Sequence, residues 1–317
     1  MQSMRTSLQR PARKKGQDPM AGHDSWPPPV RRFLLSTRAG RIGLLVPRLC
    51  MAAWRSRGLH ALWAALVWTF RSRDIASRSY HTTRLNQDEL CWTIAAVTRI
   101  PIERIMGWRD EILADDDLAR HVRRAVESSP ERWSHDPDYR LGRRLAYYLL
   151  TRALRPKRVI EAGVDRGFGA VLILRALERN AAEGSPGEYL GIDRKPEADA
   201  FLYTAYPARR GRIQCGDAAA ILRGLPGDGS LIIHDTGIEP THLAAFTAAL
   251  DAMLADDTVV ISSWLRPDFM DLARRRSRGF LGHKDSAPGH WKPPSRMSFI
   301  FPAGRQDQRD AMRTELP

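Results

Sequence analysis

From residue 138 onward, short apolar runs alternate with longer segments that have helical periodicity. The apolar runs predict strands, and the segments between them predict helices of about 8 to 15 residues. Five predicted strands begin near Val159, Tyr189, Arg212, Ser230 and Thr258, and residues 297–301 predict a final strand. Strands that alternate with helices form mostly parallel sheets with helices on both faces. Residues 138–304 are therefore expected to form a doubly wound, Rossmann-like α/β domain.

Upstream of this domain the pattern is helical. Between residues 81 and 137, Asn86, Pro101 and either Asp115 or Asp116 are placed to begin three amphipathic helices, which predicts a small helical subdomain. Residues 31–80 predict basic amphipathic helices, residues 1–30 a disordered basic arm, and residues 305–317 a tail. The arginine-rich face of the helix predicted over residues 139–153 is assigned to solvent.

Positive charge is concentrated at the N-terminal end of the chain. The net charge is +14, and residues 1–80 hold fifteen Lys and Arg against three acids. Such an arm favours contact with a phosphate-rich partner such as RNA, or with an anionic membrane surface. A solvated extension with no partner explains the charge equally well.

Two further observations bear on location. Residues 59–70 are apolar but too short to span a bilayer, so they predict a helix that lies in a membrane interface or is buried in the protein. Cys50, Cys91 and Cys215 are far apart and form no metal-binding or disulfide pattern. The expectation is a cytoplasmic protein, with peripheral membrane contact as an option.

The segment from Glu161 to Gly169 carries the clearest chemical signal. It follows a predicted strand, contains Gly163, Gly167 and Gly169, and leads into a predicted helix. A helix N-terminus at the carboxyl edge of a sheet offers unpaired N–H groups to a ligand. The glycine order is G-x-x-x-G-x-G, which differs from the dinucleotide pattern G-x-G-x-x-G. A glycine-rich turn with no ligand is the alternative.

The string EAGVDRGFG at 161–169 resembles motif I of the class I S-adenosylmethionine-dependent methyltransferases. This resemblance, which covers about residues 140–265, implies S-adenosylmethionine as the cofactor. It implies that Glu161, Gly163, Gly167 and Gly169 hold the amino-acid end of that molecule.

Acids follow the next two predicted strands as well. Asp193 closes the second strand, where a carboxylate can accept hydrogen bonds from ribose hydroxyls. Asp217 follows the third strand and resembles the methyltransferase acid that meets the adenine amino group. Its other interpretation is a helix cap, because Ala218 begins a predicted helix. Asp193 and Asp217 are therefore predicted cofactor residues.

The fourth strand supplies the catalytic candidates, Asp235 and His234. Strand side chains alternate between faces, so at most one of the two is expected to face the site, and Asp235 is favoured over a packed His234. The segment SLIIHDTG resembles the small-molecule branch of the family, in which a histidine stands where this chain has Ile238. Ser262 and Ser263 after the fifth strand offer too few hard oxygen ligands for Mg²⁺, so no metal is expected.

These features predict methyl transfer from S-adenosylmethionine to an oxygen or nitrogen of a small molecule or of a glycan or lipid precursor. Two alternatives stay open: an NAD(P)-dependent oxidoreductase on a divergent Rossmann loop, and a non-catalytic nucleotide-binding module recruited to RNA or membrane. Residues 277–296 are expected to form a long loop, and we hypothesise that it covers the acceptor pocket with Trp291.

Overall fold

The structure is a computed structural model. It describes residue 29 and residues 58–73, 80–130, 132, 135–207, 210–227, 231–237, 239–287, 291 and 294–302. The arm expected at 1–30 lies outside the described residues apart from residue 29, as do the tail expected at 305–317 and residues 31–57. The chain divides into two compact units, Met1–Leu66 and Val67–Pro317, and the fold described below belongs to the second unit.

The second unit is built on a seven-stranded sheet with the order β3-β2-β1-β4-β5-β7-β6. Neighbouring strands from β3 to β5 pair in parallel, and β7 is antiparallel to both β5 and β6. The doubly wound, mostly parallel sheet predicted from the sequence is confirmed. The strands are β1 Arg158–Ala162, β2 Glu188–Asp193, β3 Gly211–Cys215, β4 Leu231–His234, β5 Val259–Ser262, β6 Gly279–Lys284 and β7 Arg296–Phe301.

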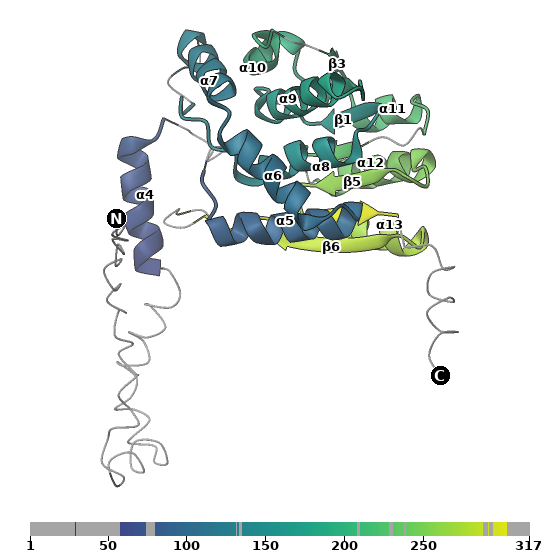
Figure 1. Cartoon of the computed structure of the whole chain (residues 1–317). Coiled ribbons are helices and arrows are strands. Elements are labelled where there is room, and N and C mark those ends of the chain that lie inside the picture. Colours follow the sequence, from purple (N-terminus) through teal and green to yellow (C-terminus); the bar gives the residue numbers. More distant parts are fainter. Residues whose placement is uncertain are drawn as a thin grey trace, which may run out of the picture. The chain divides into compact units, whose positions relative to one another are not determined.

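Helices cover both faces of this sheet and give it two apolar cores (Figure 1). One core packs α5 to α10 against the sheet, and the other packs α11 to α13 against the opposite face. The helices are α4 Gly58–Arg71, α5 Arg84–Thr98, α6 Ile102–Leu113, α7 Asp116–Ser128, α8 Leu145–Leu154, α9 Phe168–Ala182, α10 Phe201–Thr204, α11 Ala218–Arg223, α12 Pro240–Met253 and α13 Pro267–Arg275. None of the described helices is long and apolar enough to cross a membrane.

The helices predicted between residues 81 and 137 are present, and their apolar faces enter the same core as α8 and α9. Asp115 caps α7 by accepting a hydrogen bond from the Leu118 N–H, as one of the two sequence alternatives predicted. The start of α5 was predicted wrongly. Thr83 is its N-cap, whereas Asn86 is buried and donates to the Lys284 carbonyl at the end of β6.

The expectation of a long loop at residues 277–296 is wrong, because this segment contains strand β6. Gly279 and Gly282 are poor strand formers, and β6 lies at the sheet edge, so its sequence lacks the apolar run of a central strand. Pairing with β7 creates the strand. Trp291, proposed as a cover for the acceptor, has its ring 5.2 Å from that of Trp68.

Candidate active site

Two glycines of the β1–α9 loop adopt left-handed backbone angles, with φ 95° at Gly163 and 86° at Gly167. A Cβ on Gly163 would overlap the Asp235 carbonyl group, and one on Gly167 would lie 2.8 Å from the Tyr203 nitrogen. Both positions therefore require glycine for conformation and for space. As a result, the loop runs directly beside the residue that follows β4.

Gly169 is needed for a different reason, since a Cβ there would overlap Oε1 of Glu161. Glu161 is 1% exposed, and the Tyr189 hydroxyl donates to its Oε2 at 2.6 Å. Burial raises the pKa of Glu161 to about 8, with further raising contributions from Asp235 and Asp193, although the Tyr189 hydrogen bond opposes the shift. Glu161 thus packs as a buried acid against the first turn of α9.

Asp193 fastens the glycine loop to the end of β2. Its Oδ2 accepts hydrogen bonds from the Val164 and Asp165 N–H groups, both at 2.8 Å, and its Oδ1 accepts from the Lys195 N–H at 2.9 Å. A carboxylate has about four acceptor positions, so capacity for a further donor remains. Asp193 lies where the cofactor assignment needs it, and ribose binding stays a prediction.

Asp217 is the N-cap of α11 and accepts from the Ala220 N–H at 3.0 Å. This backbone hydrogen bond, followed by that from Arg194, lowers the pKa of Asp217 below its usual value. The capping alternative raised by the sequence is therefore present. A nearby His242, with Nδ1 3.7 Å from Oδ2 of Asp217, completes a small polar group at this corner.

Asp235 belongs to a nearly buried polar cluster, which we call the Asp235 cluster: Arg143, Tyr147, Asp235 and Ser263. Nη2 of Arg143 lies 2.7 Å from Oδ1 of Asp235, and both side chains are about nine-tenths buried. The Tyr147 hydroxyl donates to Oδ2 of Asp235 at 3.1 Å and lies 2.7 Å from Oγ of Ser263. The two carboxylate oxygens thus have different partners, which fixes the plane of the carboxylate.

The proton positions in the Asp235 cluster follow from its charges. Burial, and then the Asp235 charge, raise the pKa of Tyr147, so its phenol keeps its proton and donates it to Asp235. Burial alone would lower the pKa of Arg143, but Asp235 and Tyr147 raise it overall. Since the Tyr147 proton points to Asp235, Ser263 is the donor to the Tyr147 oxygen. The described residues contain no group of three His, Cys, Asp or Glu able to hold a metal ion.

His234 lies on the other face of β4, as alternation along the strand requires. It is fully buried, its Nδ1 is 3.1 Å from Oγ of Ser262, and its ring contacts those of Phe246 and Phe269. Burial lowers the pKa of His234 to about 4, so the ring is neutral at physiological pH. The geometry therefore favours Asp235 over His234 as the residue that meets an acceptor.

Sequence reasoning missed Arg143, Tyr147 and the role of Ser263. The arginine-rich face around Arg143 was assigned to solvent, which is wrong, because this side chain is 12% exposed. One local signal was available in Gly142, which adopts φ 49° and has no room for a Cβ beside the Tyr80 ring. The Tyr80 hydroxyl accepts from the Arg143 N–H at 3.3 Å, so a residue far upstream supports the cluster.

A family model described as a methyltransferase domain matches residues 160–262, the segment from the glycine loop to the end of β5. This segment, which holds Glu161, Asp193, Asp217 and Asp235, is therefore similar to a methyltransferase domain. No curated protein matches the chain.

Several solved structures are similar to it. A methyltransferase from Geobacter sulfurreducens is 20% identical, with 65% of this chain and 100% of that chain covered and a TM-score of 0.43. An O-methyltransferase from Bacillus cereus in complex with SAH is 13% identical, with 62% and 99% covered and a TM-score of 0.41. The O-methyltransferase TomG from Streptomyces achromogenes, in complex with SAM, is 17% identical, with 60% and 91% covered and a TM-score of 0.40.

Proposed function

We propose that the chain transfers the methyl group of S-adenosylmethionine to an oxygen or nitrogen of a small molecule or of a glycan or lipid precursor. The observation that carries this proposal is the Asp235 cluster. Its carboxylate follows β4 at the carboxyl edge of the sheet, and Gly163 of the cofactor loop packs against its backbone. A nearly buried carboxylate held by two donors is suited to aligning an acceptor O–H or N–H.

The residues of the loop fit the cofactor. α9 begins after Gly167, whose lack of a side chain leaves the helix without a side-chain cap, so its first N–H groups are a donor site for the carboxylate of the methionine end. Asp193 keeps acceptor capacity for the ribose hydroxyls. Asp217 lies at the next strand end, where the adenine amino group is expected.

S-adenosylmethionine supplies a methyl group bonded to a positively charged sulfur. The protein has to hold the acceptor atom in line with that bond and to take up the proton that the acceptor loses. Asp235 is the proton acceptor in this proposal, and Arg143 and Tyr147 are positioning residues that hold its carboxylate. An oxygen or nitrogen acceptor forms the new bond to carbon as the carbon–sulfur bond breaks.

The cofactor assignment is tested by calorimetry with S-adenosylhomocysteine, NAD and NADP. We expect binding of S-adenosylhomocysteine alone, and binding of NAD or NADP instead would favour the oxidoreductase alternative. Asp193→Asn is expected to weaken S-adenosylhomocysteine at least about tenfold. Because Asp193 also holds the loop, thermal unfolding without ligand is measured in parallel. Unchanged affinity would refute the ribose placement.

The acceptor assignment is tested by supplying S-adenosylmethionine with panels of phenols, carboxylic acids and amines and measuring released S-adenosylhomocysteine. Asp235→Asn is expected to lower turnover about a hundredfold while the affinity for S-adenosylhomocysteine stays within about twofold. Asp271→Asn, at an exposed position of α13, is the matched control. Equal turnover in both variants would exclude Asp235 as the proton acceptor.

A second candidate function is peripheral contact with an anionic membrane, and it rests on α4. Four large apolar side chains of α4 are exposed: Leu62, Trp63, Leu66 and Phe70. Their spacing of one, four and eight residues places them within one sector of the helix, and Arg71 follows. We propose that this face of α4, together with the basic arm, contacts the membrane and that the face enters the interface of an anionic bilayer.

Sedimentation with vesicles tests this contact. We expect binding to vesicles that contain phosphatidylserine, weaker binding to neutral vesicles, and loss of binding in a Trp63→Ser, Phe70→Ser variant. A Leu113→Ser variant, in which a different exposed leucine is replaced, is the control. Vesicle binding that the double variant keeps would refute the role of α4, and binding to RNA alone would favour RNA recruitment.

A further inference from the structure

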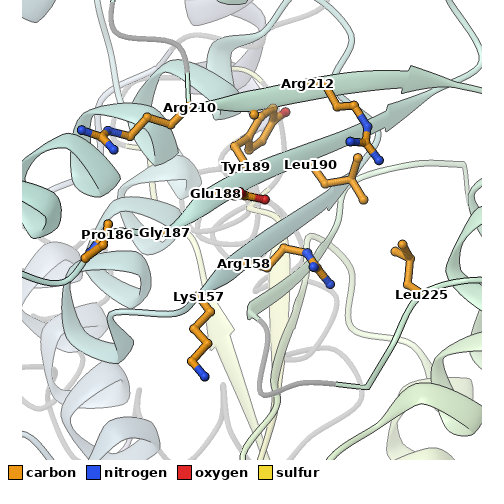
Figure 2. A pocket seen from close by; sticks show the side chains of 11 residues that line it. Lys157, Arg158, Pro186, Gly187, Glu188, Tyr189, Leu190, Arg210, Arg212 and Leu225 are labelled. Atoms are coloured by element: carbon orange, nitrogen blue, oxygen red, sulfur yellow. The ribbon is translucent and has the colours of Figure 1, made fainter.

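A hollow of about 850 Å³ lies at the edge of the sheet opposite the glycine loop, where β1, β2 and β3 begin (Figure 2). It is distinct from the methyltransferase site, because β1 extends about 13 Å between the two edges. Its lining includes four basic side chains, one carboxylate and two leucines: Lys157, Arg158, Arg210, Arg212, Glu188, Leu190 and Leu225.

The strand register brings three of these side chains to one face. Arg158 lies opposite Glu188, and Arg212 lies opposite Leu190. Residues 188 and 190 point to the same side of β2, so Arg158, Glu188 and Arg212 share that face. Figure 2 shows the ends of Arg158 and Arg212 directed to the side where Leu225 lies.

Three of the four cations that line this hollow have no acidic partner among the described residues. In the part of the chain that the structure describes, no carboxylate forms an ion pair with Lys157, Arg210 or Arg212. Glu188 is the one acidic side chain in the lining. By contrast, Arg175 and Arg179 both pair with Asp115. Cations that repel one another in a concave site concentrate an anion there.

We propose that this hollow binds a ligand that carries two or more phosphate groups. Arginine has a planar fork of donors that matches phosphate oxygens, and three of the four cations here are arginines. β1 and β3 are two strand spacings apart, roughly 10 Å, so their side chains can hold more than one phosphate. The volume is that of a small-molecule site, which favours an oligophosphate over a polymer.

The test is calorimetry of the full chain with inorganic pyrophosphate, tripolyphosphate and monophosphate at fixed ionic strength. We expect pyrophosphate and tripolyphosphate to bind, and monophosphate to bind about tenfold more weakly. An Arg210→Gln, Arg212→Gln variant is expected to weaken pyrophosphate about tenfold or more. The matched control is Arg120→Gln, Arg124→Gln on α7, which removes the same charge and leaves affinity within about twofold.

Four results would overturn the proposal: no pyrophosphate binding by the wild type, equal affinity for mono- and pyrophosphate, equal loss in the two double variants, or RNA binding that pyrophosphate does not displace. The last result would make the hollow a nucleic-acid surface. S-adenosylhomocysteine affinity is measured in the same samples and is expected to stay unchanged in both double variants. Failure of the methyltransferase assignment is therefore distinguishable from failure of this one.

Discussion

Replacing Glu161 by glutamine should remove most of the pH dependence that the titration of Glu161 gives to the free energy of unfolding. The pKa of Glu161 rises from an ordinary value of 4.5 to about 8 because the carboxyl is buried. Between these two pH values the folded protein keeps a proton that the unfolded chain has released. The free energy of unfolding therefore falls as pH rises through this window, and the glutamine variant lacks this loss.

The magnitude follows from the size of the pKa shift. One pKa unit corresponds to about 1.4 kcal/mol, so the full shift amounts to at most about 4 to 5 kcal/mol. The Tyr189 hydroxyl can still donate to the glutamine oxygen, so that hydrogen bond survives the change. We expect the variant to match or fall below the wild type near pH 5 and to exceed its stability by about 2 to 4 kcal/mol near pH 8.5.

Urea unfolding followed by circular dichroism at a series of pH values measures this difference. Groups that titrate equally in both proteins cancel when the two curves are subtracted. Glu103→Gln on the exposed face of α6 is the control and should leave the pH dependence of the wild type unchanged. Parallel curves for the wild type and Glu161→Gln, within about 0.5 kcal/mol, would refute the argument.

Three further substitutions test other parts of the structure. Gly169→Ala should lower stability by about 1 to 3 kcal/mol in thermal unfolding, and a Glu161→Ala background should recover part of that loss, since the new Cβ meets that side chain. Thr83→Ala should cost about 1 kcal/mol, measured in urea, by removing the α5 cap. Wild-type stability should fall as pH drops from 6.5 towards 4, because the buried ring of His234 must become charged, and His234→Phe should show a smaller fall.

The strands most visible in the sequence are those buried on both faces. β1, β4 and β5 each hold a short run of buried apolar residues, Val159–Ile160, Leu231–Ile233 and Val259–Ile261, and these runs were enough to find the strands. β6 is an edge strand in which only His283 is buried, and its two glycines weaken the strand signal in the sequence, so it forms by pairing with β7. The edge strand β3 is also largely exposed, yet its sequence predicted it, so the glycines of β6 rather than its exposure explain why that strand was missed.

The same distinction applies to the site. Gly163, Gly167 and Asp193 follow strands, so their local sequence marks them. Arg143 and Tyr147 reach Asp235 across 92 and 88 residues of sequence, from a helical segment whose charge pattern reads as ordinary surface. Gly142 is the one local signal in that segment, and it marks an unusual backbone beside Arg143 without specifying the contact with Asp235.

The partners of Asp235 decide what that acid can do. Arg143 supplies a positive charge to one oxygen of the Asp235 carboxylate, and Tyr147 supplies a hydroxyl proton to the other. Each of these donors occupies a different oxygen, so an incoming O–H or N–H must approach along the remaining lone-pair directions. Asp235, which the sequence predicts, marks where the proposed reaction takes place. Arg143 and Tyr147, which the sequence does not predict, restrict the direction from which an acceptor approaches.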